Sequence, residues 1–222
     1  MSASIRVMVA DDSPQVRAAL SRFLEARADL ELVGEASDGA QAVEVYGSVL
    51  PDLVLMDLQM PATSGIEAIE RICRRWPDAV VVAFTTFATH DHVVRALRGG
   101  AAGYLLKDVG AHGLVEGMHQ ALAGEMPLSP AVRQRLVASL HGAPAGQGRV
   151  HGITPREVEV LQWLAHGLSN AEIGARLNVA EGTVKQHMAN VAGKLEARSR
   201  TQVLVRAIQL GVVDPENLPA LD

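Results

Sequence analysis

Residues 53–61 read Leu-Val-Leu-Met-Asp-Leu-Gln-Met-Pro, a run of four apolar residues closed by Asp57. Two further apolar runs also end in charge: residues 5–10 precede Asp11 and Asp12, and residues 103–106 precede Lys107. Short apolar runs of this kind are typical of buried parallel strands. In an open α/β sheet the carboxyl ends of the strands lie at one edge, where ligands bind. The sequence therefore predicts that these charged side chains meet at that edge.

The first half of the chain alternates strand-like and helix-like segments. Strands are expected over residues 5–10, 30–36, 53–56, 80–84 and 103–106, and each is followed by a helix. The first expected helix begins at Pro14 after a Ser13 cap, and the next two cover 41–47 and 65–76. The fourth ends at 99–100, and the fifth reaches about residue 123. Such βα units predict a doubly wound α/β fold, in which helices cover both faces of a five-stranded parallel sheet. An all-helical fold is excluded because the apolar runs are β-rich and too short for helices.

In the second half the apolar residues recur with the period of an α-helix. Residues 141–152 hold four glycines and a proline, which is typical of a flexible linker, and a short helix is expected before them at 130–140. Thr154, Pro155 and Glu157 form a capping box that opens a helix closed by Gly167. Helices over 170–177, 181–195 and 200–210 follow, and the short gap between the first two of these is helix-turn-helix spacing. We expect three parts: a domain over 1–126, a linker with a short helix over 127–152, and an all-α four-helix domain over 153–222.

Composition limits the classes of function. The chain has 222 residues, enough for two small domains. Residues 1–128 carry 10 Lys/Arg and 17 Asp/Glu, a net of −7, whereas residues 129–222 carry 10 and 8, a net of +2. This asymmetry favours a cation-binding first half and a second half that can approach a polyanion. Cys73 is the single cysteine and is expected on a buried helix face, so no internal disulfide is possible. No run is long enough to span a membrane, and we expect a cytoplasmic protein without a membrane partner.

The charged strand ends predict a phosphoryl-acceptor site. A carboxylate can accept a phosphoryl group as an acyl phosphate, and the transfer requires charge neutralisation and positioning. Mg²⁺ suits Asp11, Asp12 and Asp57 because it takes one or two carboxylates, water and phosphate oxygens. Lys107 can offset the remaining charge and pair with the phosphoryl group, and Thr85 or Thr86 offers a hydroxyl. The alternative, in which acids after strands only cap the next helix, applies to single positions better than to the whole set.

The helix expected at 181–195 has one apolar face and one polar face. Val184, Met188, Val191 and Leu195 follow helical spacing and should face the core. Its polar positions are Thr183, Lys185, Gln186, His187, Asn190 and Lys194. The second helix of a helix-turn-helix lies in the major groove of double-stranded DNA, where Gln186 can pair with adenine and Lys185 with guanine or phosphate. The alternative is an ordinary solvated helix face.

The acid and lysine motifs resemble the signature of two-component receiver domains, over roughly residues 3–124. This signature is formed by Ala10-Asp11-Asp12, by Val54-Leu55-Met56-Asp57-Leu58-Gln59-Met60-Pro61 and by Ala101-Ala102-Gly103-Tyr104-Leu105-Leu106-Lys107-Asp108. The resemblance implies a flavodoxin-like receiver in which Asp57 is the phospho-acceptor and Asp12 a direct Mg²⁺ ligand. Asp11 would act through water, and the backbone carbonyl of Gln59 would be a further ligand. Thr85 would be the switch hydroxyl, Tyr104 the aromatic that reorients with it, and Lys107 the phosphoryl partner.

The second half resembles the LuxR-type DNA-binding domain over about residues 150–213. The motifs are residues 154–161, 167–173 with Asn170, 183–187, and Lys194-Leu195 with Arg200. Together the two halves resemble NarL/FixJ-type response regulators. This implies a transcription factor phosphorylated by a cognate sensor histidine kinase, whose phosphorylation frees the DNA-binding half and favours a homodimer on paired promoter half-sites. Asn170 joins the polar positions of residues 183–194 as an expected DNA contact.

Three positions depart from the LuxR-type pattern, one of them Ala189, where some members place a basic or polar residue. Ala180 replaces the usual capping serine, and Gly193 lies inside the helix; each should cost about 1 kcal/mol of helix stability. Three rival functions remain open from the sequence. A phosphatase with an aspartyl-phosphate intermediate would want an acid where Gln59 stands, a σ-factor-like helical half would bind protein, and a third type of regulator would act without phosphorylation.

Overall fold

The computed structural model describes residues 4–86, 89–129, 132, 152–214 and 218–220. Its first half contains the strands β1 (Ile5–Ala10), β2 (Leu30–Ala36), β3 (Leu53–Met56), β4 (Val81–Thr85) and β5 (Gly103–Leu106). The helices between and after them are α1 (Pro14–Glu25), α2 (Gly39–Val49), α3 (Gly65–Arg75), α4 (His90–Gly99) and α5 (Gly110–Leu122). The second half contains α7 (Pro155–Ala165), α8 (Asn170–Leu177), α9 (Glu181–Lys194) and α10 (Arg200–Gln209). The α/β fold followed by a helical domain is confirmed.

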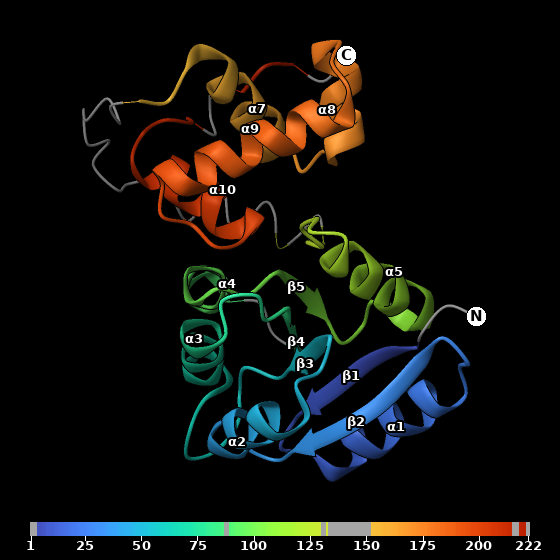
Figure 1. Ribbon diagram of the computed structural model, residues 1–222. Helices are drawn as coiled ribbons and strands as arrows, with labels where there is room; N and C mark the ends of the chain where they lie inside the picture. Colours follow the sequence, from blue (N-terminus) through green and yellow to red (C-terminus); the bar gives the residue numbers. More distant parts are fainter. Residues whose placement is uncertain (1–3, 87–88, 130–131, 133–151, 215–217, 221–222) are drawn as a thin grey trace.

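The sheet is parallel throughout, in the order β2-β1-β3-β4-β5 (Figure 1). After the edge strand β2 the chain returns past β1 to β3, so the strand order reverses between β1 and β3. Alternate residues of the central strands enter two cores. Val9 and Leu55 pack with α1 and α5, whereas Met8 and Val54 pack with α2, α3 and α4. Helices therefore cover both faces, and the central strands are buried on both sides as their unbroken apolar runs predict.

Local signals in the sequence explain several helix starts. Ser13 caps α1 through the backbone N–H of Val16, with Pro14 at the first helical position. Thr154 and Glu157 form the expected capping box of α7. No helix in the described residues is long and apolar enough to cross a membrane. The short helix expected at 130–140 and most of the linker expected at 141–152 lie outside the described residues.

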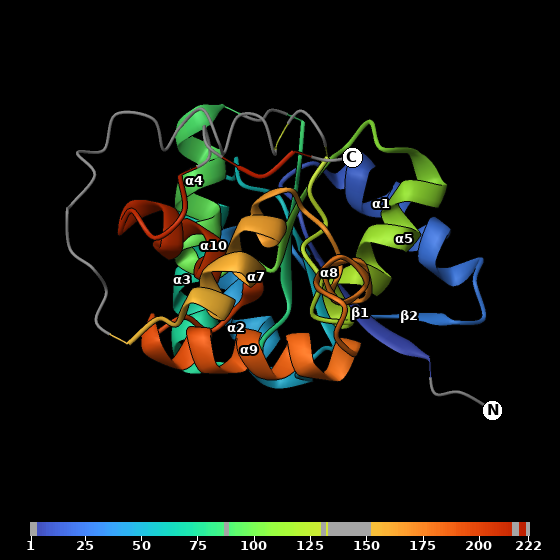
Figure 2. The ribbon, with the colours of Figure 1, turned by 90° about the horizontal axis from the view of Figure 1, so that it is seen from above.

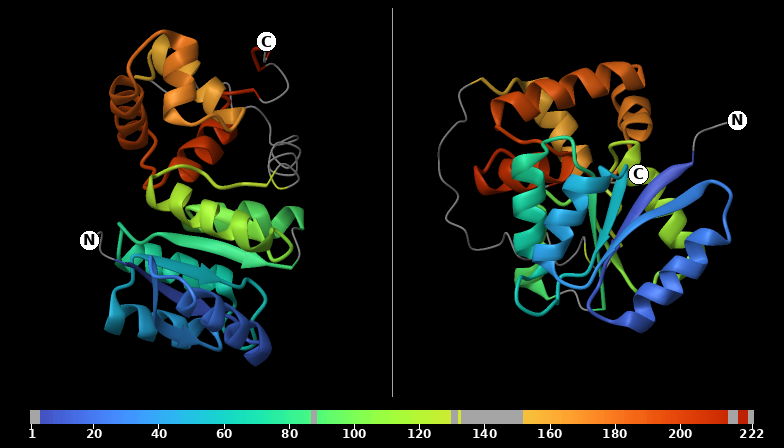
Figure 3. Two further views of the ribbon diagram at one scale, coloured as in Figure 1. Left: turned by 90° about the vertical axis from the view of Figure 1, so that its right-hand side faces the viewer. Right: turned by 60° about the horizontal axis from the view of Figure 1, so that its bottom comes forward.

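The helical domain lies on the receiver-like half beside α4 (Figures 1 and 2; Figure 3, left). The Thr201 hydroxyl at the start of α10 donates to the carbonyl of Ala102 at 3.0 Å. Gln202 Nε2 donates to the carbonyl of Arg98 at 3.1 Å. The Arg198 guanidinium donates to the carbonyl of Cys73 at 3.2 Å. The first turn of α10 is thus bound to backbone carbonyls around α3, α4 and β5, and the apolar core continues across this contact.

The segment after α5 returns to the sheet. The backbone N–H of Tyr104 in β5 donates to the carbonyl of Pro127 at 2.9 Å, and Leu128 forms a parallel bridge with Tyr104. Met126 and Leu128 are buried there. The chain that leads towards the helical domain therefore lies along the edge strand β5 and shields it from solvent.

Candidate functional site

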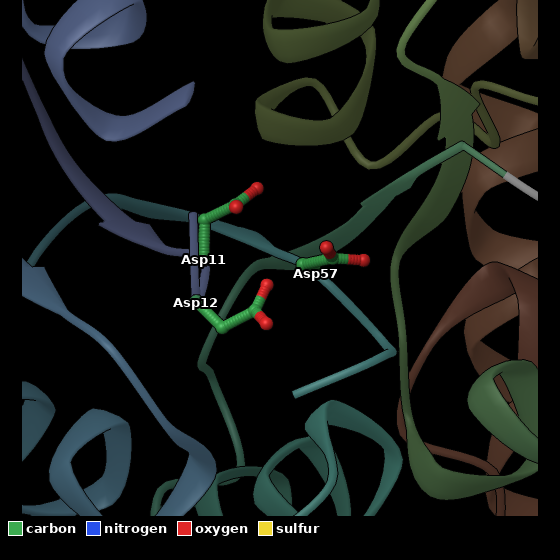
Figure 4. A group of neighbouring side chains, drawn as sticks. All are labelled: Asp11, Asp12 and Asp57. Atoms are coloured by element: carbon green, nitrogen blue, oxygen red, sulfur yellow. The ribbon is translucent and has the colours of Figure 1, made fainter. Parts of the chain in front are cut away.

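Three carboxylates meet at the carboxyl ends of β1 and β3. One oxygen from each of Asp11, Asp12 and Asp57 lies within 4.8 Å of the others (Figure 4). Asp11 and Asp57 are 1% and 6% exposed, whereas Asp12 is open to solvent. Lys107 Nζ lies 2.6 Å from Asp11 Oδ2 and 2.7 Å from Asp57 Oδ2. The predicted cluster of acids and its lysine is therefore assembled at the predicted edge.

The sheet register fixes these positions. β1 and β3 are neighbours with Ala10 opposite Met56, so Asp11 and Asp57 follow adjacent strand ends. The backbone N–H of Asp57 donates to the carbonyl of Ala10 at 2.7 Å. Gly65, the first residue of α3, packs so closely that a Cβ there would lie 1.8 Å from the Asp57 carbonyl oxygen. Only glycine allows this approach, which holds the loop after β3 against the start of α3.

Burial and the neighbouring charges have opposite effects on the pKa values of Asp11 and Lys107. Burial raises the pKa of Asp11 above its usual range, although the hydrogen bond and charge of Lys107 act in the opposite direction. Burial acts to lower the pKa of Lys107, but its hydrogen bonds to Asp11 and Asp57 and their charges outweigh burial and raise that pKa. Lys107 is therefore held as a cation. A single lysine faces three carboxylates, and this excess of negative charge favours a bound cation.

Two further predicted residues flank the cluster. Thr85 is the last residue of β4, one position later than the strand end expected from the sequence, and it is 1% exposed. Its hydroxyl has no hydrogen-bond partner among the described residues. Tyr104, in β5, is fully buried. Thr86, the other residue that the sequence left open, is exposed. Gln59 is exposed, and its backbone N–H donates to Asp57 Oδ1 at 3.3 Å.

The helix α9 has the two faces that its sequence predicts. Val184, Met188 and Val191 are buried. Five of the expected DNA contacts keep at least part of their side chains in solvent although the first domain is docked nearby: Thr183, Lys185, Gln186, His187 and Asn190. Lys185 pairs with Glu181 at 2.7 Å, and Gln186 Nε2 donates to Asn190 Oδ1 at 3.1 Å. The polar face of α9 is therefore free to meet a ligand.

Two models of known families match the chain. The response regulator receiver domain matches residues 7–119, and the luxR family of bacterial regulatory proteins matches residues 151–207. The chain belongs to the NarL/FixJ-type response regulators. It combines a receiver with a LuxR-type DNA-binding domain, and its relatives are transcriptional regulatory proteins. The family is one of regulators, so the phosphatase alternative is not supported.

The resemblance extends over nearly the whole response regulator. The nitrate/nitrite response regulator protein NarL of Escherichia coli (strain K12) is 38% identical, over 90% of this chain and 93% of that protein. The transcriptional regulatory protein LiaR of Bacillus subtilis (strain 168) is also 38% identical, over 91% of this chain and 96% of that protein. The crystal structure of response regulator ChrA, from a heme-sensing two-component system, is 34% identical with a TM-score of 0.53, over 96% of this chain and 100% of that chain.

Two of the DNA contacts expected for this response regulator, Asn170 and Lys194, also make polar contacts within the helical domain. Asn170 is 8% exposed, and its side-chain oxygen accepts a hydrogen bond from Arg200. Lys194 Nζ lies 2.6 Å from Glu157 Oε2 and 2.7 Å from Oε1, and Glu157 is 2% exposed. Asn170 is thus largely enclosed, whereas Lys194 pairs with a buried acid and keeps 32% of its side chain exposed.

The residues that join the two domains were not foreseen from the sequence. Arg198, Thr201 and Gln202 carry the three hydrogen bonds to the receiver. Each would be an ordinary polar residue on a small helical domain, and their partners are backbone carbonyls, which leave no mark on the sequence. Only the structure shows that the apolar core continues into the second half at this contact.

Proposed function

We propose that a sensor histidine kinase transfers a phosphoryl group to Asp57 and thereby switches binding of the response regulator to promoter DNA. The observation that carries this proposal is the buried Asp57 carboxylate, 2.7 Å from the Lys107 ammonium and close to two further acids. Transfer breaks the bond from phosphorus to the kinase's histidine nitrogen and forms one to an Asp57 oxygen. Such a transfer needs positioned charge more than covalent help. We place this reaction and the DNA binding in the cytoplasm.

The acidic cluster suits Mg²⁺. Asp11, Asp12 and Asp57 supply hard carboxylate oxygens within a short distance of one another, and the exposure of Asp12 leaves room for water on the ion. The backbone carbonyl of Gln59 is the further ligand that we assign. When bound, Mg²⁺ neutralises the acids and the phosphoryl oxygens. Lys107 then balances the remaining negative charge beside Asp57.

The switch from the acceptor to DNA runs through Thr85 and Tyr104. The Thr85 hydroxyl is buried without a partner among the described residues, so a phosphoryl oxygen on Asp57 would give it a hydrogen bond that it now lacks. Tyr104 lies in β5 and pairs through its backbone with Pro127, while Ala102, two residues earlier, accepts the Thr201 hydrogen bond. A shift of Thr85 and Tyr104 would thus reach both connections between the domains.

The released helical domain then dimerises and binds double-stranded promoter DNA. We assign Thr183, Lys185, Gln186, His187 and Asn190 to this contact because they form the solvent-facing part of α9. The receiver leaves these residues accessible and contacts α10 instead, the helix on which we place the dimer contact. Hindrance in the unphosphorylated protein would therefore act on dimerisation through α10. A dimer would bind paired half-sites about one helical turn apart.

The acceptor is tested by labelling with acetyl phosphate and Mg²⁺. Asp57→Asn should abolish the phosphorylated species seen by intact mass, because the amide offers no nucleophilic carboxylate. Asp78→Asn, an exposed acid outside the cluster, is the matched control and should be labelled like the wild type. Chelation of Mg²⁺ should also suppress labelling of the wild type. Persistent labelling of Asp57→Asn would overturn the assignment.

The DNA surface is tested by the salt dependence of binding. Lys185→Ala should weaken binding of the phosphorylated protein to duplex DNA and reduce the slope of log affinity against log salt by about one phosphate contact. The loss includes the ion pair to Glu181, so Glu181→Gln serves as the control that breaks this pair and keeps the lysine. An unchanged slope in Lys185→Ala would remove this residue from the phosphate contacts.

A further inference from the structure

An open cavity of about 650 Å³ lies between the two domains. Its walls come from α3 and α4 of the receiver and from α9, α10 and the turn between them. The charged residues that line it are Arg74, Arg98, Arg198, Arg206, Glu70 and Glu196. Four arginines and two glutamates thus line the cavity, a net of +2 in a chain whose overall charge is −5. The local charge is opposite to that of the molecule.

The positive charge of this cavity is not neutralised from within. Among the described residues, none of its four arginines forms an ion pair. Arg198 donates to the carbonyl of Cys73 at 3.2 Å, and Arg206 donates to the carbonyl of Leu195 at 2.6 Å. These neutral oxygens fix the direction of the guanidinium groups and leave their charge in place. Grouped arginines held in this way match the oxygens of a phosphate, with which a guanidinium forms paired hydrogen bonds.

Gly193 keeps the cavity open on the side of α9. A Cβ at this position would meet no atom within 4 Å, and the residue lines the cavity. Glycine inside a helix costs roughly 1 kcal/mol relative to alanine. Neither a close approach nor a left-handed backbone requires it here. The consequence of Gly193 is space for an occupant beside the arginines.

We propose that this cavity binds a small phosphate-bearing anion, such as pyrophosphate or the phosphate chain of a nucleotide. The site is complete only while the receiver and the helical domain are in contact, because Arg74 and Arg98 come from one and Arg198 and Arg206 from the other. A ligand that binds only while the two domains are in contact increases the fraction of molecules in which they are docked. The anion would therefore hold α10 on the receiver and oppose release of the DNA-binding domain. This second consequence, unlike the binding itself, rests on the proposed function.

Binding is tested by calorimetric titration of the full-length, unphosphorylated protein with pyrophosphate. Ionic strength is held constant, and a chelator keeps Mg²⁺ from joining the anion to the acidic cluster. We expect saturable binding of pyrophosphate to one site. Arg74→Gln should lower the affinity about tenfold or more, and the Arg74 side chain forms no hydrogen bond among the described residues. Arg71→Gln, on the same helix but paired with Glu67 outside the cavity, should bind as the wild type does. Absence of saturable binding, or equal binding by Arg74→Gln, would overturn the site.

Two further variants separate the cavity from other surfaces. Gly193→Leu should weaken pyrophosphate binding because its side chain occupies the part of the cavity beside α9 without removing charge, and it should fold because it improves helix propensity. Lys185→Ala should not change the affinity; a loss confined to this variant would place the anion on the DNA surface and refute the proposal. Pyrophosphate should also weaken DNA binding by the wild type but not by Arg74→Gln. Pyrophosphate binding without an effect on DNA would keep the site and overturn its coupling to release.

Discussion

At the scale of single residues, Glu157 combines two structural tasks. Its carboxylate accepts from the backbone N–H of Thr154 at 2.7 Å, which completes the capping box of α7, and it also receives the Lys194 ammonium. Burial acts to raise the pKa of Glu157, but the hydrogen bonds from Lys194 and Thr154 outweigh it and lower that pKa below 4.5. One buried charge thereby connects the first helix of the DNA-binding domain to the end of α9.

The lowered pKa of Glu157 predicts an acid-dependent loss of stability. Its ionised form stabilises the fold above the unfolded pKa, and this contribution disappears as the pH falls through the folded pKa, below about 4.5. Glu157→Gln keeps a capping side chain but removes the charge, so its free energy of unfolding at pH 7 should fall by about 1–3 kcal/mol. Denaturant titrations between pH 7 and pH 3 should show the gap to the wild type narrowing in acid. Glu159→Gln, an exposed partner of Arg156, should show little change; a constant gap for Glu157→Gln would contradict the argument.

Some site residues can be predicted from the segment of sequence in which they lie, whereas the contacts of others depend on partners far away in the chain. Asp57, Asp11 and Lys107 could be predicted because each directly follows a strand, and parallel strands bring their ends together. The contacts of Asn170 with Arg200 and of Lys194 with Glu157 could not be predicted, because the partners lie 30 and 37 positions away in the chain. Polar residues on a helix carry no mark of which face packs inward when their partners belong to another helix.

At the scale of elements, α9 begins without a side-chain cap. Ala180 has the extended backbone of a capping residue, with φ −65° and ψ 148°, but no side chain that accepts a hydrogen bond. Ala180→Ser should therefore raise the free energy of unfolding by about 1 kcal/mol, because the hydroxyl can accept from a free backbone N–H in the first turn. Thermal and denaturant unfolding would measure this gain. Ala180→Val adds bulk without an acceptor and should give no gain; equal stabilisation by both would refute capping as the cause.

Element types were predictable throughout the described residues, whereas some element ends were not. α2 begins at Gly39, two residues before the expected start, because the Asp38 side chain accepts from the N–H groups of Ala40 and Gln41. β4 extends to Thr85 because its ladder with β5 continues to Leu106. A cap or a ladder partner sets each boundary, and only the cap can be seen in the local sequence. The helix expected at 130–140 stays a prediction.

At the scale of the whole molecule, the DNA-binding helix and the docked helix are different helices. The receiver holds residues 198–202, at and just before the start of α10, by three hydrogen bonds to backbone carbonyls, while the polar face of α9 stays accessible. The docking position could not be predicted from the sequence, because every residue has a carbonyl acceptor. Control of DNA binding through α10 would act on assembly of the dimer and leave each recognition helix exposed.

This arrangement predicts that one hydroxyl regulates release of the DNA-binding domain. Thr201 is fully buried, and Thr201→Val keeps its shape while leaving the Ala102 carbonyl without this donor. A buried polar group left unpaired costs about 1–3 kcal/mol, and water satisfies the same carbonyl once the domains separate. The docked state alone is destabilised, so the unphosphorylated Thr201→Val protein should bind DNA roughly tenfold more tightly than the wild type. Gel shifts without acetyl phosphate would measure this difference. Thr63→Val, whose hydroxyl makes no hydrogen bond among the described residues, is the control, and wild-type affinity in Thr201→Val would show that this contact does not restrain the DNA-binding domain.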